Sequence, residues 1–171
     1  MRPGTKKCFF LLLAILLLCL LAWRLTPHTF EQMTASDQNA ITSLAGAATF
    51  LGVRDGTTYA ESYTLQNVSP EDTAFEPILI LLNSTRYRAD LRNLLPWDID
   101  SVSAGRAFDG RSVSLVLVWG PSADECCSLS LSGRQIAVSR PHHDEFLIYH
   151  PEDPELLNWL SIYIANNGEK G

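Results

Sequence analysis

The sequence has few basic residues once its N-terminal segment is set aside. Of 171 residues, 13 are Lys or Arg and 19 are Asp or Glu, and the formal net charge is −6. Four basic residues flank an N-terminal apolar segment: Arg2, Lys6, Lys7 and Arg24. The rest of the chain therefore has nine basic residues against nineteen acids, a net charge of −10. Nucleic-acid binding depends on neutralising phosphates with Lys and Arg, so we expect no nucleic-acid ligand.

Cysteine is also scarce. Two of the four cysteines, Cys8 and Cys19, lie in the apolar segment, and the other two, Cys126 and Cys127, are adjacent. Neighbours in a strand point to opposite faces, so we expect no disulfide and no shared metal between them. The domain must then be held by its apolar core, which a chain of this length can supply.

Motifs for catalysis are missing as well. The chain has no H-E-x-x-H sequence, no glycine-rich phosphate loop and no G-x-S-x-G turn. We therefore expect no nucleotide and no other cofactor. A Ser–His–Asp triad is not excluded by residue order alone, and it would use Ser112 or a loop serine with one of the four histidines.

The apolar segment Cys8–Trp23 contains sixteen residues without a charge. A membrane-spanning helix needs about 20 such residues, and Lys7 and Arg24 can extend the effective span by snorkelling. We predict that residues 1–25 form a cytoplasmic stub and an uncleaved transmembrane anchor, in contact with the lipid bilayer through residues 8–25. The excess of basic residues before the segment favours a cytoplasmic N-terminus and a domain outside the cell membrane.

Two alternatives to the anchor are a cleaved signal peptide and a buried helix of a soluble protein. A cleavage site needs small residues, whereas the segment ends with Leu20-Leu21-Ala22-Trp23-Arg24. A lipoprotein signal is disfavoured too, because three leucines precede Cys19. The uncleaved anchor is the interpretation that fits these residues best.

We predict a linker over residues 26–37 and an extracytoplasmic domain over residues 38–171. The domain opens with a weak helical pattern over residues 38–48, capped by Asp37 and built on an apolar stripe: Ile41, Leu44, Ala45 and Ala48. A hairpin over residues 50–65 follows, centred on the turn Asp55–Gly56.

The remaining elements alternate between helix and strand patterns. Thr73 and Glu76 predict a capping box for a helix over residues 74–84, followed by a connector over residues 87–95 and a loop over residues 98–110. Alternating apolar residues predict four strands: 113–119, 126–132, 135–139 and 146–149. A last helix over residues 154–166 has an apolar stripe: Leu156, Trp159, Leu160, Tyr163 and Ile164. The fold class is therefore α+β, a two-layer domain of antiparallel sheet (hairpin plus meander) covered by two or three helices.

Three segments of the chain are Asp55-Gly56-Thr57, the run Leu81–Arg88, and Leu94-Leu95-Pro96. Together with the meander and the closing strand, over residues 48–166, they resemble small extracytoplasmic domains of unknown function from Gram-positive bacteria. Members of this group are usually lipoproteins or membrane-anchored. The resemblance implies a location and a shape, but no reaction.

One basic cluster stands out in the acidic domain: Arg86, Tyr87, Arg88 and Arg92. Arg and Tyr are favoured at the centres of protein interfaces, so these residues are candidates for binding an anion or a partner. The alternative is ion pairing with neighbouring acids on a solvated surface.

Histidines are the other candidates. His142, His143 and His150 could hold zinc or a similar metal, although their spacing matches no known metal motif. A polar loop before a strand accounts for the same residues without a metal.

Our leading hypothesis is a membrane-tethered, non-enzymatic domain that binds something outside the membrane. One alternative is an envelope hydrolase, metal-dependent or serine-based, that uses the histidines at 142–150. Another is an accessory subunit of a larger membrane assembly, with a protein partner at the membrane or in the envelope.

Overall fold

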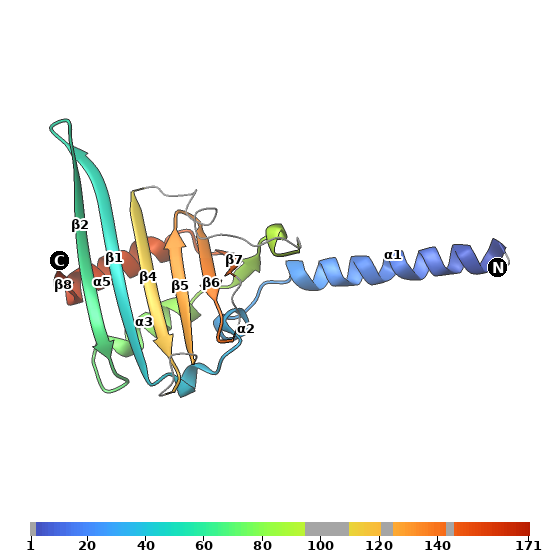
Figure 1. The fold of residues 1–171 in the computed structure, drawn as a ribbon, viewed down its shortest axis with the longest axis horizontal. Coiled ribbons are helices and arrows are strands. Elements are labelled where there is room, and N and C mark those ends of the chain that lie inside the picture. The colour runs from blue at the N-terminus through green and yellow to red at the C-terminus, as the bar shows by residue number, and fades with distance from the viewer. Residues whose placement is uncertain (1–2, 95–109, 121–124, 143–145) are drawn as a thin grey trace.

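A single large antiparallel sheet, with helices packed on one face, forms the body of the molecule (Figure 1). This computed structural model describes the backbone of residues 3–94, 110–120, 125–142 and 146–171, and side chains within these ranges except for residues 3–7, 23–25 and 94. The fold is mixed α/β, as the sequence predicts. The predicted loop over residues 98–110 lies outside the described residues except for Gly110.

The described strands form an eight-stranded sheet in the order β3-β7-β6-β5-β4-β1-β2-β8, with every neighbouring pair antiparallel. Its strands are β1 (Ser43–Arg54), β2 (Thr57–Val68), β3 (Tyr87–Ala89), β4 (Arg111–Val118), β5 (Cys126–Ser132), β6 (Gln135–Ser139), β7 (Phe146–Pro151) and β8 (Glu169–Lys170). The order β6-β5-β4 is the predicted meander. Cys126 lies opposite Val118 while Cys127 is fully buried, so the adjacent cysteines point apart.

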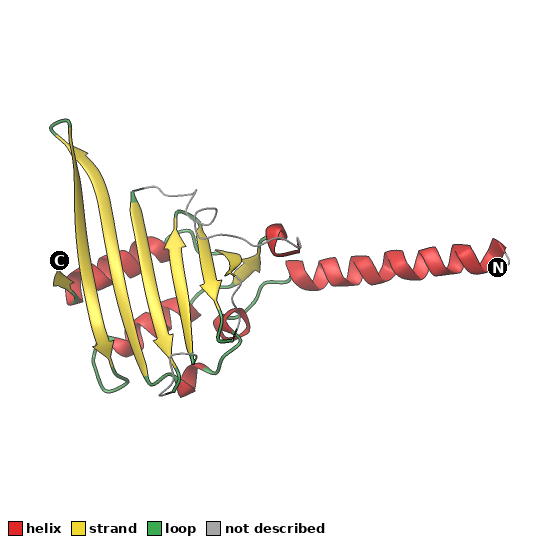
Figure 2. Cartoon of the chain, in the orientation of Figure 1, coloured by secondary structure: helices red, strands yellow, loops and turns green. Residues whose placement is uncertain are grey.

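Helices α3 (Phe75–Asn83) and α5 (Leu156–Asn167) cover one face of the sheet, as predicted (Figure 2). Helix α5 packs on β1, β2 and β4, next to α3. The core between the layers is built from apolar side chains of alternate strand positions, including Val113, Leu115, Leu117, Leu129 and Leu131. An ideal Cβ on Gly46 would lie 2.9 Å from Leu115 Cδ2 and 3.4 Å from Ile164 Cδ1, so this glycine allows α5 to approach the sheet closely.

The predicted hairpin is present and longer than expected. Asp55 and Gly56 both have positive φ angles, 53° and 77°. Two such residues form the type I′ turn that suits the right-handed twist of paired strands. The pairing then continues as far as Leu44 and Val68.

The predicted helix over residues 38–48 is wrong. Asp37 does cap a turn, since its carboxylate accepts a hydrogen bond from the Asn39 amide, but the turn is the short 3-10 helix η1 (Gln38–Ala40). Strand β1 follows from Ser43. Leu44 and Ala48 are four residues apart, a separation that places two residues on the same face of either a helix or a strand. Pairing with β2 and β4 is what makes this segment a strand.

The predicted linker over residues 26–37 is also wrong, because this segment belongs to the domain. Helix α2 (Phe30–Thr34) begins with a capping box in which Thr29 and Gln32 bond each other's backbone amides. Phe30 and Met33 are buried in the core. His28 pairs with Tyr87 through two backbone hydrogen bonds of 2.8 and 3.0 Å.

The caps and faces of the two covering helices differ from the prediction. Thr73 makes no cap for α3, whose N-cap is Ala74 without a side-chain hydrogen bond. In α5 the buried face consists of Leu156, Leu157, Leu160, Ser161 and Ile164. Trp159, predicted to be core, is 52% exposed. The connector over residues 87–95 contains β3 and the 3-10 helix η2 (Leu91–Leu94).

Helix α1 (Pro3–Leu25) projects from the edge of the sheet near β3 (Figure 1). Its described large apolar side chains, between Phe9 and Leu21, are 40–66% exposed. Among the residues with described side chains, no helix combines the length and the apolar character needed to cross a membrane.

The sheet face opposite α3 and α5 is uncharged across β1, β2, β4, β5 and β6, within the part of the chain that the structure describes. The strand registers place mostly small residues there, of which Ser132 and Ala137 are buried: Ala45, Ala47, Thr49, Ser62, Thr64, Ser112, Ser114, Val116, Ser128, Ser130, Ser132, Ala137 and Ser139. We call this surface the open face. The acidic charge of the domain therefore lies elsewhere.

Candidate functional site

An apolar groove lies between the outer sides of α3 and α5. We call it the α3–α5 groove. It has a volume of about 340 Å³. Its lining is apolar apart from one asparagine and one tyrosine hydroxyl: Pro77, Ile80, Leu81, Trp159, Ile162, Tyr163 and Asn166. The walls are the most exposed apolar side chains of the two helices, with exposed fractions of 58% for Ile80, 52% for Trp159 and 41% for Ile162.

The composition of the helices explains this surface. Helix α5 has no charged residue in its twelve positions, and α3 has only Glu76. A helix with one face on the core normally carries charged or polar residues on the other face. In α5 the outward positions are taken by Trp159 and Ile162, so the outer face of this helix remains apolar. The lining of the groove can bind apolar groups and offers almost no hydrogen bonds.

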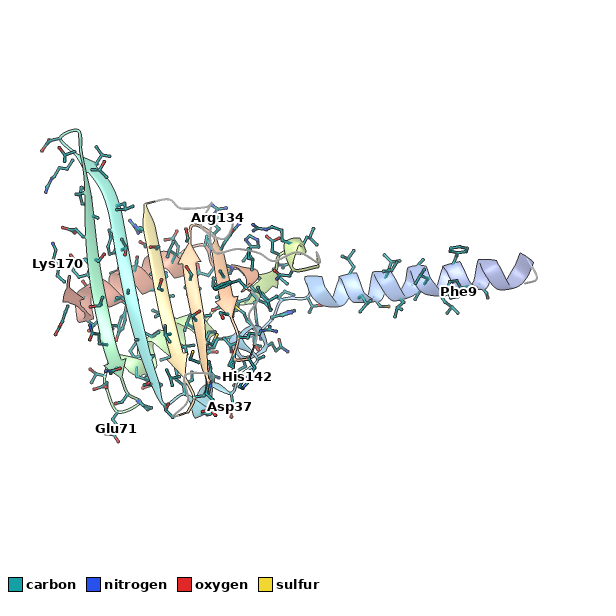
Figure 3. The ribbon with its side chains drawn as sticks, in the orientation of Figure 1. Phe9, Asp37, Glu71, Arg134, His142 and Lys170 are labelled. Carbon is teal, nitrogen blue, oxygen red and sulfur yellow. The ribbon has the colours of Figure 1, made fainter. Side chains whose placement is uncertain are left out.

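Acidic residues stand at both ends of the groove. Thr85 Oγ1 accepts a 2.9 Å hydrogen bond from the Asp153 amide, so the end of α3 lies next to the start of α5. Asp153 and Glu155 lie at this end. Glu76, in the first turn of α3 and four residues before Ile80, lies at the other, whereas Figure 3 shows Glu71 on the turn after β2.

The structure disperses the predicted binding cluster. Tyr87 is fully buried, where burial raises the pKa of its hydroxyl, and its hydroxyl donates to the carbonyl of Leu82. It belongs to the core, so our prediction of a binding role for Tyr87 is corrected. Arg88 donates from Nε and Nη2 to Glu152 at 2.8 and 2.6 Å. Arg86 is exposed, and its carbonyl accepts the Glu152 amide.

Arg92 is bound in a separate cluster around Asp90. Arg92 Nε and Nη2 donate to the two Asp90 carboxylate oxygens at 3.0 and 2.9 Å, and the Arg92 amide donates to Oδ1 at 2.8 Å. These hydrogen bonds from Arg92 hold the pKa of Asp90 well below its usual range, with a smaller contribution from His150. The geometry is that of a structural ion pair, which was our alternative for the basic residues.

The predicted metal ligands do not converge. His142 lies in the turn after β6, with a positive φ of 60°, and His143 lies outside the described residues. Phe146 pairs with Ser139, and His150 lies four residues further along β7, roughly 13 Å away at about 3.3 Å per residue. Figure 3 labels His142 at one end of β6 and Arg134, whose carbonyl contacts His150, at the other. Within the described ranges, no three His, Cys, Asp or Glu side chains lie close enough to share a metal.

His150 is not placed as a catalytic base either. Its Nε2 lies 2.8 Å from Asp90 Oδ2, and its Nδ1 lies 3.0 Å from the carbonyl oxygen of Arg134. A general base needs a ring nitrogen that can accept a proton from the nucleophile. Both nitrogens of His150 instead face oxygen acceptors. Ser112, the serine named for a triad, lies on the open face opposite Thr49 and Ser132.

The groove residues were not singled out from the sequence, although a signal exists. Residues 156–167 contain eight apolar residues and no charge, which is more apolar surface than one buried stripe requires. Pro77, Ile80 and Ile162 then follow as the outward positions once the buried faces are known. In a comparison with known proteins, no family model, no curated protein and no solved structure matches this chain. A function must therefore be proposed from the surfaces of the structure itself.

Proposed function

We propose that this chain is a membrane-tethered extracytoplasmic domain that binds a protein partner through the α3–α5 groove. The observation that carries the proposal is the outer side of α5, where Trp159 and Ile162 are exposed on a helix without charge. An exposed apolar patch with polar surroundings is typical of a surface that another molecule covers.

The tether is proposed from the N-terminal helix. The side chains described in α1 cover residues 8–22, while its backbone continues over 23 residues, about 35 Å at 1.5 Å per residue. The hydrocarbon core of a bilayer is about 30 Å thick. An isolated helix with this much exposed Leu and Phe is unfavourable in water and favourable in lipid. The resemblance to small membrane-anchored extracytoplasmic domains stays a prediction that agrees with this placement.

Tethering also suits a binding role. A chain confined to a membrane meets other confined proteins at a high effective concentration, so a small apolar site is sufficient for association. The partner would then be an exported segment of another membrane or envelope protein. This includes the case in which the chain is an accessory subunit of a larger assembly.

Photo-crosslinking in intact membranes tests the groove. A photoreactive phenylalanine analogue replaces Ile162 in the full chain, and a matched variant carries the same analogue at Ser130, which is exposed on the open face. We expect a protein adduct from position 162, identified by mass spectrometry, and no adduct of the same mass from position 130. An Ile80→Glu change in the first variant should abolish the adduct, because it places a carboxylate in the apolar wall.

The proposal fails if position 162 yields no protein adduct, or if both positions yield the same one. An adduct that persists with Ile80→Glu would also contradict it, since the contact would then not depend on the groove.

A further inference from the structure

Resting on the proposed function, we infer that the occupant of the α3–α5 groove is an amphipathic helix of the partner, with Lys or Arg at both ends of its apolar stripe. Three features support this assignment: the shape of the groove, its lining, and the charges at its two ends.

The shape fits a helix. Helices α3 and α5 lie side by side on the sheet, with the end of α3 next to the start of α5. On α5 the lining residues Trp159, Ile162, Tyr163 and Asn166 recur at i, i+3, i+4 and i+7. This spacing is the one by which helices pack ridge into groove, and a helix in a groove is a common mode of peptide recognition.

The lining selects an apolar stripe. The exposed walls, Ile80, Trp159 and Ile162, present hydrocarbon and an aromatic ring, and a buried polar group of the occupant would find few partners there. Burial of a polar group without a hydrogen bond is unfavourable. The occupant must therefore be apolar along the floor of the groove.

The ends select basic residues. Glu76 lies one helical turn before Ile80 at one end, and Glu155 lies one turn before Trp159 at the other with Asp153 beside it; Glu76 and Glu155 are both exposed. Neither helix contains Lys, Arg or His, and the exposed Arg86, just after α3, lines a separate pocket with Glu31 on the α2 side. Arg111 reaches α5 from β4, where it hydrogen-bonds Asn158 and lies 5.9 Å from the centre of the Phe50 ring, so this cation is already in use.

The same charges disfavour other occupants. A second copy of this chain would bring its own acidic ends and a domain charge of −10 against the groove. An anionic lipid surface would be repelled in the same way, because exposed like charges within a Debye length destabilise association.

Binding of designed helical peptides to the full chain in phosphatidylcholine nanodiscs tests the inference. One fluorescent peptide has Leu at i, i+3, i+4 and i+7 and two Lys at each end. A second has Glu in place of Lys, and a third keeps the Lys ends but scrambles the order of the central residues. We expect fluorescence anisotropy to show about tenfold tighter binding of the first peptide than of either other one, with the charge preference shrinking at high salt.

Charge reversal supplies a matched control. Glu76→Lys places a lysine in the first turn of α3, one helical turn before Ile80, and Asp55→Lys places one at the tip of the β1–β2 hairpin, away from the groove. The first change should lower the affinity for the Lys-ended peptide several-fold and raise the affinity for the Glu-ended peptide. The second should leave both affinities unchanged, although it alters the net charge equally.

The inference is overturned if the Lys-ended and Glu-ended peptides bind equally, if the scrambled peptide binds as well, or if the two charge reversals act alike. It is also overturned if the adduct at position 162 is a second copy of this chain or lipid. A protein adduct at position 162 without any charge preference would refute the basic ends and leave the proposed partner site standing.

Discussion

At the scale of single residues, Asp90 is the group most tightly held by its neighbours. Its two oxygens accept four hydrogen bonds, from Arg92 and His150, and its side chain is only 15% exposed. The carboxylate joins η2 to β7, which lies next to the sheet edge formed by β3. The Asp90 carboxyl group therefore stabilises the fold through these hydrogen bonds only while it is ionised.

The lowered pKa of Asp90 predicts an acid-dependent loss of stability. An aspartate whose pKa is lower in the folded state stabilises the fold above its unfolded-state pKa, about 3.9, and loses this contribution as the pH falls towards the folded-state pKa. Asp90→Asn should therefore reduce the free energy of unfolding by about 1–3 kcal/mol at pH 7, with a smaller deficit at pH 3. Urea unfolding of the full chain in a non-ionic detergent, followed by circular dichroism, measures the difference.

Glu71→Gln is the control for Asp90→Asn. Glu71 is an exposed acid on a turn outside the Asp90 cluster, so its replacement should change the free energy of unfolding little at either pH. A deficit for Asp90→Asn that stays constant from pH 7 to pH 3 would show that the ionised carboxylate is not what stabilises this edge.

At the scale of elements, helix α5 has a structural face and an exposed face. Leu160 is fully buried against the sheet, and its neighbour Trp159 forms a wall of the groove. Leu160→Ala should lower the free energy of unfolding by about 2–5 kcal/mol, through lost transfer energy and the cavity that remains. Trp159→Ala should lower it by much less than that, while abolishing the binding of the Lys-ended peptide. Denaturation and anisotropy on the same two variants separate the effects.

If Trp159→Ala unfolds the domain as readily as Leu160→Ala, the helix is turned and the groove is not a free surface. Asn158→Ala is a third variant for the series, because Asn158 is half-buried and contacts Arg111 at the sheet side. Its effect should be small, since one exposed polar contact contributes little.

The elements with an unambiguous pattern were predictable. Strands β4, β5 and β6 and the Asp55–Gly56 turn follow from alternation and from turn chemistry, and the structure confirms them. The structure of residues 38–48 was not predictable, because their alanines are compatible with a helix and with a strand, and the spacing of their apolar residues fits both periodicities. Helix α2 is too short to show periodicity, but Thr29 and Gln32 carry a capping-box pattern that would have revealed its start.

The candidate site was the least predictable part. Helix α5 is apolar on nearly all sides, so its pattern does not fix which residues face the sheet. Trp159 is the largest residue of the predicted stripe, yet Ser161 takes a buried position instead. The rotation of the helix is set by Gly46 and the neighbouring strand side chains, which are distant in sequence. Glu152, the partner of Arg88, is also distant in sequence, whereas Asp90 lies only two residues before Arg92 and fits the ion-pair alternative.

At the scale of the whole molecule, the proposed tether makes a direct prediction. The full chain should remain in the membrane pellet after extraction with alkaline carbonate, since an apolar helix in lipid is not released by breaking ionic contacts. N-terminal sequencing of the pelleted protein should begin at or near Met1. Leu16→Arg with Leu17→Arg should move the chain to the supernatant, because charges at the bilayer centre are costly.

Ser130→Arg with Ala60→Arg is the matched control for the anchor variant, because it adds the same charge on exposed positions of two strands that are not neighbours. This control should stay in the pellet. A mature N-terminus between Thr26 and Phe30 would instead identify a cleaved signal peptide.

The direction of the strands relative to α1 determines how far the groove lies from the end of the sheet at which α1 is attached. The strands run across the axis of α1, and β3 is the strand nearest to it (Figure 1). With α1 along the membrane normal, each strand adds about 4.8 Å of elevation, so β4 lies roughly 19 Å and β2 roughly 29 Å above β3. Helix α5 rests on β4, β1 and β2. In the proposed arrangement the sheet holds the groove away from the membrane, and the proposed partner helix lies about 20–30 Å farther from the bilayer than β3 does.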